Sequence, residues 1–550
     1  MKIRIFTGLA ISAVLISACT SATKAEPATD LSSYLSQSIS WQPCPNDYFV
    51  SSEQFASSFE KSSADCATVN VPAIYSGSQT LSDFKIEMMR QPAPVDSKIG
   101  TLFINPGGPG GSGIQELQWT DFPSAIRAKY DIVGFDPRGV NKSAPVSGNQ
   151  IKCSTRDDYE TYWTGELTPS NDKEFLASID KLDAYYRNCA AANPTWWTLS
   201  TKNVVSDLEI MRQVITGDEP LNFLGSSYGT TIAAAYITRY PDKVGHIVLD
   251  SPTTNAPDTP SAQIAQAKSL EANVMRLVKG YAKARNKSVT QVKKLMLKVR
   301  QWGDDNKLIG FAGMKVIDPV NQIHRSNEYM FTHGIQVLTY YDTGIAQKYF
   351  NQGLDEVSKN KWNGTFEYFA MSMDGYDSDT LGGSKYEPDK IKRDNSYEVM
   401  DIVNSMDLEF VDKTTKKQKK ELAKKLKAAA PFWSQLTGDP SNYEYQGKRE
   451  GLSWTKLAKA DASIPDPPTA KPKRTNTSGK KVLVVGSKYE STTPYEFAVK
   501  TAADLKSPIV TYLGTEHAPV ASFSNTCLNK LFIDYLVDDK APTRPVTCRK

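Results

Sequence analysis

Residues 221–231 read LNFLGSSYGTT, and this stretch decides the fold. Residues 221–224 are apolar and predict a short buried strand, whereas residues 230–240 have a helical pattern that Pro241 ends. The pentapeptide between them, GSSYG, matches G-x-S-x-G. A strand, a sharp turn and a helix around such a pentapeptide form a nucleophile elbow, which exposes the central serine hydroxyl above a sheet.

Strand and helix patterns alternate on both sides of this turn. After a linker at residues 465–478 the alternation resumes, whereas residues 256–460 have a mainly helical pattern. The sequence therefore predicts an α/β fold, with a mostly parallel sheet, helices on both faces and a large, mainly helical lid insertion. The other predicted strands are 84–90, 101–104, 130–135, 246–249, 482–485 and 508–513, and the main predicted helices are 204–214, 262–284, 289–303 and 526–537.

The two adjacent serines of the turn are not equivalent. Ser227 has glycine two residues away on both sides, whereas Ser226 has Leu224 and Tyr228 at that distance. We therefore expect Ser227 to be the nucleophile and Ser226 to be a small residue that the turn requires.

A serine nucleophile needs a base, and histidine is the usual one. The chain has four histidines. His246 begins a predicted strand and is interpreted as structural, and His324 and His333 lie in the insertion. His517 follows the last predicted strand, where this arrangement of strands places the base, so it is the predicted base.

The third group must be an acid that lies between the serine and the histidine in chain order. Glu490, in the loop GSKYESTTP after the strand at 482–485, is the predicted acid. Asp250, at the end of an earlier strand, is the alternative. Glu496 is a weaker candidate, because it falls in the following predicted helix.

A glycine-rich loop, NPGGPGGSG at residues 105–113, follows the strand at 101–104. An oxyanion needs two backbone N–H donors, one from the residue after the nucleophile and one from such a loop. We expect Tyr228 and Gly108 to supply them.

The same loop also satisfies a dinucleotide-binding pattern, Gly108-x-Gly110-x-x-Gly113, with Asp136 about 20 residues further on. Prolines at 106 and 109 are awkward in that turn. The dinucleotide interpretation also leaves the elbow and His517 unused, so we expect no cofactor.

The N-terminus has the pattern of an export signal. Lys2 and Arg4 precede an apolar stretch at residues 5–16, which is shorter than the ~20 residues of a spanning helix. The stretch ends in ISAC, which resembles a bacterial lipoprotein signal with Cys19 as the lipidated residue. We expect an exported protein, lipid-anchored to the outer face of a bacterial cell membrane; plain secretion is the alternative.

Composition and cysteine content agree with export of a globular protein. The net charge of +4 does not indicate a nucleic-acid partner. Without Cys19 six cysteines remain, and an even number suggests three disulfides among fifteen pairings, with nearest-neighbour pairing the simplest. No spacing of cysteine or histidine indicates a metal site. The six are Cys44, Cys66, Cys153, Cys189, Cys527 and Cys548.

Residues 413–427 carry eight lysines at helical spacing. The favoured interpretation is a solvated helix face. The alternative is contact with anionic headgroups or a wall polymer.

Taken together, NPGGPGGSG, DPRG, GSSYG, the Thr-Pro after Glu490 and the two cysteines around the last helix resemble the tripeptidyl aminopeptidase family. Its members are secreted or lipid-anchored serine peptidases with the α/β-hydrolase fold, related to prolyl aminopeptidases. The resemblance covers roughly residues 40–255 and 480–550, and it implies nearest-neighbour disulfides. It places the Ser, acid and His roles on Ser227, Glu490 and His517, with Glu in place of the family's Asp. Met373 and Gly451 stand where a further cysteine pair of the family is expected.

The resemblance implies an aminopeptidase that releases di- or tripeptides from free N-termini of peptide substrates. Such an enzyme needs carboxylates for the substrate ammonium, and Glu367 and Asp374 in the insertion are the candidates. The alternatives are an esterase or lipase with the same triad, and a non-catalytic peptide-binding lipoprotein. The expected organisation is a signal peptide (1–18), a lipidated N-terminus and tether (19–40), the first part of the hydrolase core (41–255), the lid insertion (256–460) and the C-terminal part of the core (461–550).

Overall fold

The computed structural model describes residues 29–50, 55–76, 81–148, 150–153, 184–254, 259–305, 309–310, 324–325, 327–362, 364–373, 394–407, 415–437 and 482–550. Cys19, the signal segment, Asp374, Gly451 and the linker at 465–478 therefore lie outside the described residues. Among the described residues, no helix has the length and apolar character needed to cross a membrane.

One large sheet organises the described residues. Its strand order is β1-β2-β3-β5-β4-β7-β8-β11-β12-β13, with β6 paired to β3. Every pair from β5 to β13 is parallel, and the pairs that join β1, β2, β3 and β5 are antiparallel. The strands are β1 (Gln42–Pro43), β2 (Asp65–Val71), β3 (Phe84–Gln91), β4 (Gly100–Asn105), β5 (Tyr130–Phe135), β6 (Ala144–Pro145), β7 (Leu221–Ser226), β8 (Val244–Asp250), β11 (Val482–Ser487), β12 (Ile509–Tyr512) and β13 (Val546–Cys548).

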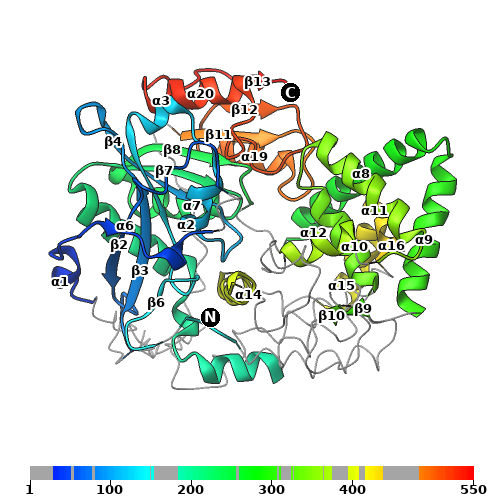
Figure 1. The fold of residues 1–550 in the computed structure, drawn as a ribbon, viewed down its shortest axis with the longest axis horizontal. Helices are drawn as coiled ribbons and strands as arrows, with labels where there is room; N and C mark the ends of the chain where they lie inside the picture. Colours follow the sequence, from blue (N-terminus) through cyan, green and yellow to red (C-terminus); the bar gives the residue numbers. More distant parts are fainter. Residues whose placement is uncertain are drawn as a thin grey trace, which may run out of the picture.

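Helices cover both faces of this sheet, as the sequence predicts (Figure 1). The central strands are apolar at consecutive positions because alternate side chains enter two different cores. Phe103 and Phe223 belong to one core, whereas Leu102 and Leu224 belong to the other. The first core is covered by α6 (Thr201–Thr216), α7 (Gly229–Arg239), α14 (Ser396–Asp407) and α19 (Tyr495–Asp504), and the second by α2 (Gly113–Trp119), α3 (Ser124–Arg127) and α20 (Thr526–Leu536).

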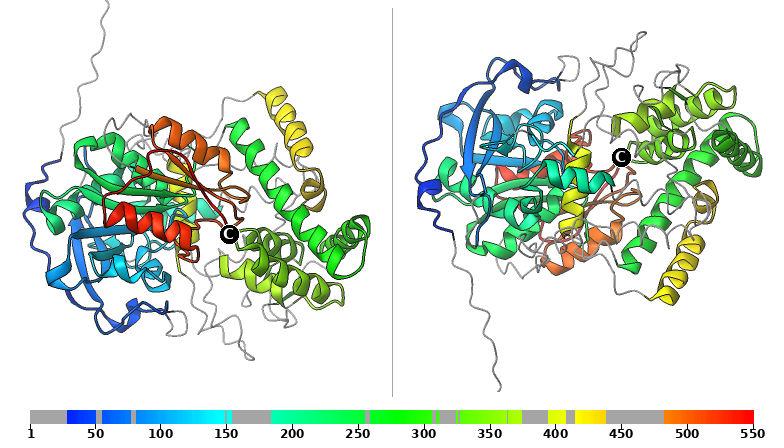
Figure 2. Two further views of the ribbon diagram at one scale, coloured as in Figure 1. Left: turned by 90° about the horizontal axis from the view of Figure 1, so that it is seen from above. Right: turned by 90° about the horizontal axis from the view of Figure 1, so that it is seen from below.

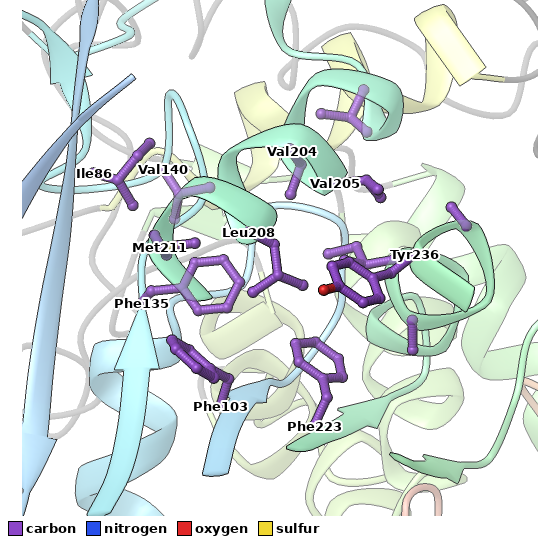
Figure 3. Close-up of a cluster of buried hydrophobic side chains, with 14 of the residues drawn as sticks. Ile86, Phe103, Phe135, Val140, Val204, Val205, Leu208, Met211, Phe223 and Tyr236 are labelled. Carbon is purple, nitrogen blue, oxygen red and sulfur yellow. The ribbon is translucent and has the colours of Figure 1, made fainter. Parts of the chain in front are cut away.

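The first core shows how tightly α6 packs on the strands. Phe103, Phe135 and Phe223 point from three neighbouring strands toward Leu208 and Met211 of α6 (Figure 3). All five side chains are fully buried. This packing fixes β7, and therefore the turn that follows it, relative to the rest of the sheet.

A second group of helices has a hydrophobic core of its own. It contains α8 (Pro260–Ala284), α9 (Val289–Asp305), α10 (Asn327–Leu338), α11 (Thr343–Val357), α12 (Thr365–Met373), α15 (Lys416–Ala429) and α16 (Pro431–Leu436), and β9 (Ile309–Gly310) pairs with β10 (His324–Arg325) beside them. We call these helices the helical body. It lies beside the β11–β13 end of the sheet in all views (Figures 1 and 2).

The three disulfides join nearest neighbours in the chain. The bonds are Cys44–Cys66, Cys153–Cys189 and Cys527–Cys548, which confirms the pairing that the family resemblance implies. The third bond links α20 to β13, so it closes the C-terminal end of the sheet.

Candidate active site

The turn after β7 has the geometry of a nucleophile elbow. Ser227 has a φ of 52°, in the left-handed region. A Cβ on Gly225 would lie 2.5 Å from the Gly229 carbonyl oxygen, and one on Gly229 would lie 2.4 Å from the Asn105 carbonyl oxygen. Only glycine fits at these two positions, so the spacing that singled out Ser227 has a steric cause.

The predicted base and acid contact each other. His517, in the loop after β12, has its Nδ1 atom 3.2 Å from Oε1 of Glu490, in the loop after β11. The Glu490 side chain is fully buried. Thr493 donates to the same Oε1 through its backbone N–H, at 2.6 Å, and through its hydroxyl, and Ser251 Oγ donates to Oε2 at 2.6 Å. Four hydrogen bonds therefore fix the carboxylate.

The two alternative acids make other contacts. Asp250 is fully buried, and its Oδ2 accepts the N–H groups of Val520 at 2.8 Å and Ala521 at 3.0 Å. Its burial raises the pKa of this carboxyl to about 7. Glu496 is exposed in the first turn of α19. Among the described residues, the carboxylate that accepts a hydrogen bond from the imidazole is that of Glu490.

The electrostatics around His517 favour its protonated form. Burial alone would lower the pKa of the imidazole. The negative charge of Glu490, the hydrogen bond from His517 to Glu490 and the charge of Asp250 outweigh burial, and together they raise the pKa above its ordinary value. This environment suits a base that must carry a proton during the reaction.

Strand order brings the nucleophile to the same place. β7, β8, β11 and β12 are consecutive parallel strands, so their carboxyl ends meet at one edge of the sheet. Ser227 follows β7, Glu490 follows β11 and His517 follows β12. The hydrogen bonds of the described residues join His517 to Glu490, and the contact of His517 with Ser227 stays a prediction from this order.

The loop at 105–113 lies against the elbow. Gly107 has a φ of 103°, and a Cβ there would lie 2.6 Å from the Ser226 carbonyl oxygen and 2.8 Å from the Tyr228 nitrogen. The Gly107 N–H is used internally, at 3.0 Å from Asn105 Oδ1. The backbone hydrogen bonds of the described residues give no carbonyl acceptor to the N–H groups of Gly108 and Tyr228, the predicted oxyanion donors.

Gly107→Ala should lower kcat by about 10²–10³-fold, because the methyl group displaces either the oxyanion loop or Tyr228. The measurement is kcat with a peptidyl arylamide, alongside thermal unfolding. Gly217→Ala is the matched control, since Gly217 also has a positive φ, of 65°, but a Cβ there would meet no atom of the described residues within 4 Å. An unchanged kcat for Gly107→Ala would contradict the placement of the loop.

The dinucleotide interpretation finds no support in this loop. Asp136, its ribose-binding candidate, is buried. Its Oδ1 accepts the Ser112 hydroxyl at 2.5 Å, and Ser112 in turn accepts the Gln115 N–H as the N-cap of α2. Asp136 therefore fastens the loop to α2. Among the described residues, no group of three His, Cys, Asp or Glu side chains could hold a metal ion.

The helical body holds the loops of the acid and the base, which the sequence did not indicate. The His517 N–H donates to the Tyr340 carbonyl oxygen at 3.0 Å, in the turn between α10 and α11. From α8, Asn273 Nδ2 donates to the Tyr489 carbonyl oxygen at 2.7 Å, and Ser269 Oγ donates to that of Glu490. Contacts of this kind involve backbone atoms of one partner, so no sequence motif marks them.

Helix α14 contacts both predicted oxyanion segments. At its start, the Ser396 carbonyl oxygen would lie 2.1 Å from a Cβ on Gly110. At its end, Asp407 accepts the Tyr228 hydroxyl at 3.3 Å and the Thr201 N–H at 3.1 Å. Burial raises the pKa of Asp407 to about 6. This helix belongs to the predicted insertion but packs in the core that covers the sheet.

The remaining predicted residues lie elsewhere. Glu367 is on α12 of the helical body, and its side chain is buried. His246 is in β8, where Nε2 lies 2.9 Å from Asp539, in keeping with its structural interpretation. His324 and His333 are in β10 and α10 of the helical body.

Comparison with known proteins identifies the fold family. A family model described as "alpha/beta hydrolase fold" matches residues 100–378. The chain belongs to the α/β-hydrolase family. A second model, described as "TAP-like protein", matches residues 453–548 of this α/β-hydrolase.

Named relatives support the resemblance to tripeptidyl aminopeptidases. Serine protease Hip1 of Mycobacterium tuberculosis (strain H37Rv) is 26% identical over 94% of this chain and 91% of that protein. Tripeptidyl aminopeptidase of Streptomyces coelicolor is 30% identical over 39% of this chain and 38% of that protein. Carboxylesterase B of M. tuberculosis (strain CDC 1551) is 26% identical over 92% of this chain and 89% of that protein. The α/β-hydrolase described here is a serine hydrolase.

Proposed function

We propose that this serine hydrolase is an aminopeptidase that releases di- or tripeptides from free N-termini through an acyl-enzyme on Ser227. The observation that carries the proposal is the His517–Glu490 hydrogen bond at the sheet edge where the elbow exposes Ser227. The similarity to a protein named serine protease over nearly the whole chain favours a peptide bond as the target.

The proposed reaction gives each of these groups one role. His517 takes the proton of Ser227 Oγ as the oxygen attacks the substrate carbonyl carbon. The N–H groups of Gly108 and Tyr228 stabilise the oxyanion, and Glu490 stabilises the protonated imidazole. His517 then passes its proton to the amine nitrogen as the peptide C–N bond breaks. The amine departs, and the acyl group stays bound to Ser227 as an ester. Water, deprotonated by His517, attacks the ester, and the released Ser227 Oγ regains the proton.

The helical body is the proposed source of exopeptidase selectivity. It contacts the loops of both Glu490 and His517, and we assign to it one boundary of the substrate site at Ser227. An exopeptidase must bind the substrate ammonium with carboxylates, and we assign this role to Glu367 and Asp374. Glu367 is carried by the helical body.

The proposed location is outside the cytoplasm. Three disulfides are typical of exported proteins. We propose that the chain is anchored to the outer face of a bacterial cell membrane through a lipid on Cys19.

Blocking the substrate amine tests the aminopeptidase proposal. A tripeptidyl arylamide with a free N-terminus should be cleaved with a kcat/KM at least about 10²-fold higher than its N-acetyl form, because acetylation leaves the amine-binding carboxylates unpaired. The control is p-nitrophenyl acetate, which tests the triad without an amine. Equal cleavage of free and acetylated peptides would sink the proposal.

An esterase is the second candidate function, favoured by the similarity to carboxylesterase B. The same triad would serve both reactions. An esterase should cleave acyl esters with a higher kcat/KM than any free-amine peptide of a mixed library. Mass spectrometry identifies the products from the library.

A further inference from the structure

The dipeptide Asp250-Ser251 lies between the three members of the triad. Ser251 directly follows β8, and its φ of 52° turns the chain sharply toward the neighbouring strand. Its N–H donates to the Val485 carbonyl oxygen of β11 at 3.0 Å. Both residues are buried, and among the described residues the Asp250 Oδ1 atom has no hydrogen-bond partner.

The Ser251 hydroxyl bridges the acid and the loop of the base. It accepts a hydrogen bond at 3.0 Å from the N–H of Ala518, the residue after His517. It also lies 2.6 Å from Oε2 of Glu490. An ionised carboxylate only accepts hydrogen bonds, so the single hydroxyl proton of Ser251 must point at Glu490. The direction of both hydrogen bonds is therefore determined.

Asp250 joins this pair of loops to the nucleophile. Its carbonyl oxygen accepts the Ser227 N–H at 3.0 Å. Its Oδ2 accepts the N–H groups of Val520 and Ala521, in the loop that follows His517. One carboxylate and one carbonyl thus connect the elbow to the His517 loop.

We propose that Ser251 is a positioning residue, whose hydroxyl locks the Glu490 carboxylate and the His517 loop together, and that Asp250 locks this unit to the elbow. The need for such a lock follows from the glutamate. Glu490 has one more rotatable bond than an aspartate, and without Ser251 its Oε2 would be buried with no donor among the described residues. The inference rests on the proposed triad but not on the peptide specificity.

The test is the second-order rate constant for labelling of Ser227 by a fluorophosphonate, measured on the full chain. This reaction needs the triad but no peptide site. Ser251→Ala should slow labelling by about 10–100-fold and lower kcat for the arylamide to a similar extent, with KM within about threefold. Ser251→Gly, which suits the positive φ and removes the same hydroxyl, should behave alike and covers a folding failure of the alanine variant.

A double-mutant cycle separates positioning from general destabilisation. In the Glu490→Gln background, Ser251→Ala should slow labelling by a smaller factor than in the wild-type background, because the contact of the hydroxyl with the carboxylate is already gone and only its contact with the Ala518 N–H remains to be lost. Ser522→Ala is the matched control, since that hydroxyl lies in the loop that follows His517 but contacts Pro519 and Ser524. It should label at the wild-type rate.

Two results would overturn the inference: a wild-type labelling rate for both Ser251 variants, or an equal loss in both backgrounds. Failure of the proposed function has a different signature. If Ser227→Ala is still labelled, the triad assignment is wrong. If the wild-type protein is labelled but cleaves no free-amine peptide, only the aminopeptidase proposal fails, and the role of Ser251 stands.

Discussion

Ser227→Ala should reduce kcat for a peptidyl arylamide by about 10⁵–10⁶-fold and abolish labelling by a fluorophosphonate. The substitution removes Ser227 Oγ, the atom that we expect to form the acyl-enzyme. Residual hydrolysis over water would come from the oxyanion donors and substrate binding. The measurements are steady-state turnover and mass spectrometry of the labelled protein.

The neighbouring serine provides the control for this variant. Ser226 is buried at the end of β7, and its carbonyl oxygen packs near Gly107. Ser226→Ala keeps the small size that this position requires, so we expect kcat within about tenfold of wild type and full labelling. Loss of labelling in Ser226→Ala but not in Ser227→Ala would reverse the assignment. Unchanged thermal unfolding of Ser227→Ala is also expected, because its hydroxyl is not needed for the turn.

The parts of this protein that sequence predicts well depend on local signals. The sequence predicts the strand at 130–135 with the bounds that β5 has, because six consecutive residues are buried on both faces of the sheet. The elbow is predictable from Gly225 and Gly229, because a Cβ at either position would clash with a backbone carbonyl oxygen. The position of His517 after the last long strand depends only on chain order.

The parts that sequence does not predict depend on contacts between residues that are far apart in the chain. Tyr340 contacts the loop of His517 through its carbonyl oxygen, which every residue type carries. The sequence does not single out Ser251, because a serine after a strand has no special pattern, although it bridges two loops about 240 and 270 residues further along the chain. The six cysteines alone also leave fifteen pairings open, because the cysteine positions in the chain do not show which side chains meet in the fold.

The proposed acid, Glu490, stands where the resemblance to tripeptidyl aminopeptidases implies an aspartate, and its contacts suggest how the longer side chain would serve in that role. The longer side chain still brings Oε1 to 3.2 Å from His517 Nδ1. Thr493 donates a hydrogen bond to Oε1, and Ser251 donates one to Oε2. The extra methylene group is thus compensated by donors on both oxygens.

Glu490→Gln should lower kcat/KM by about 10⁴-fold. The amide has one acceptor oxygen where the carboxylate has two, so it cannot satisfy Thr493, Ser251 and His517 together. It also lacks the negative charge that stabilises the protonated imidazole. Because that charge raises the pKa of His517, its removal lowers this pKa. The acidic limb of kcat/KM, which requires neutral His517, should therefore move to lower pH in the remaining activity.

Two further variants decide between the candidate acids. Asp250→Asn removes the negative charge but keeps an oxygen acceptor for the N–H groups of Val520 and Ala521. We therefore expect kcat/KM to fall by less than about a hundredfold. The acidic limb of kcat/KM should move to lower pH, by less than in Glu490→Gln. Glu496→Gln alters an exposed side chain and should match wild type. Among the described residues, the charged groups that raise the pKa of His517 are Glu490 and Asp250, so the size of each shift ranks the two carboxylates. A loss of about 10⁴-fold in Asp250→Asn with a small loss in Glu490→Gln would make Asp250 the catalytic acid.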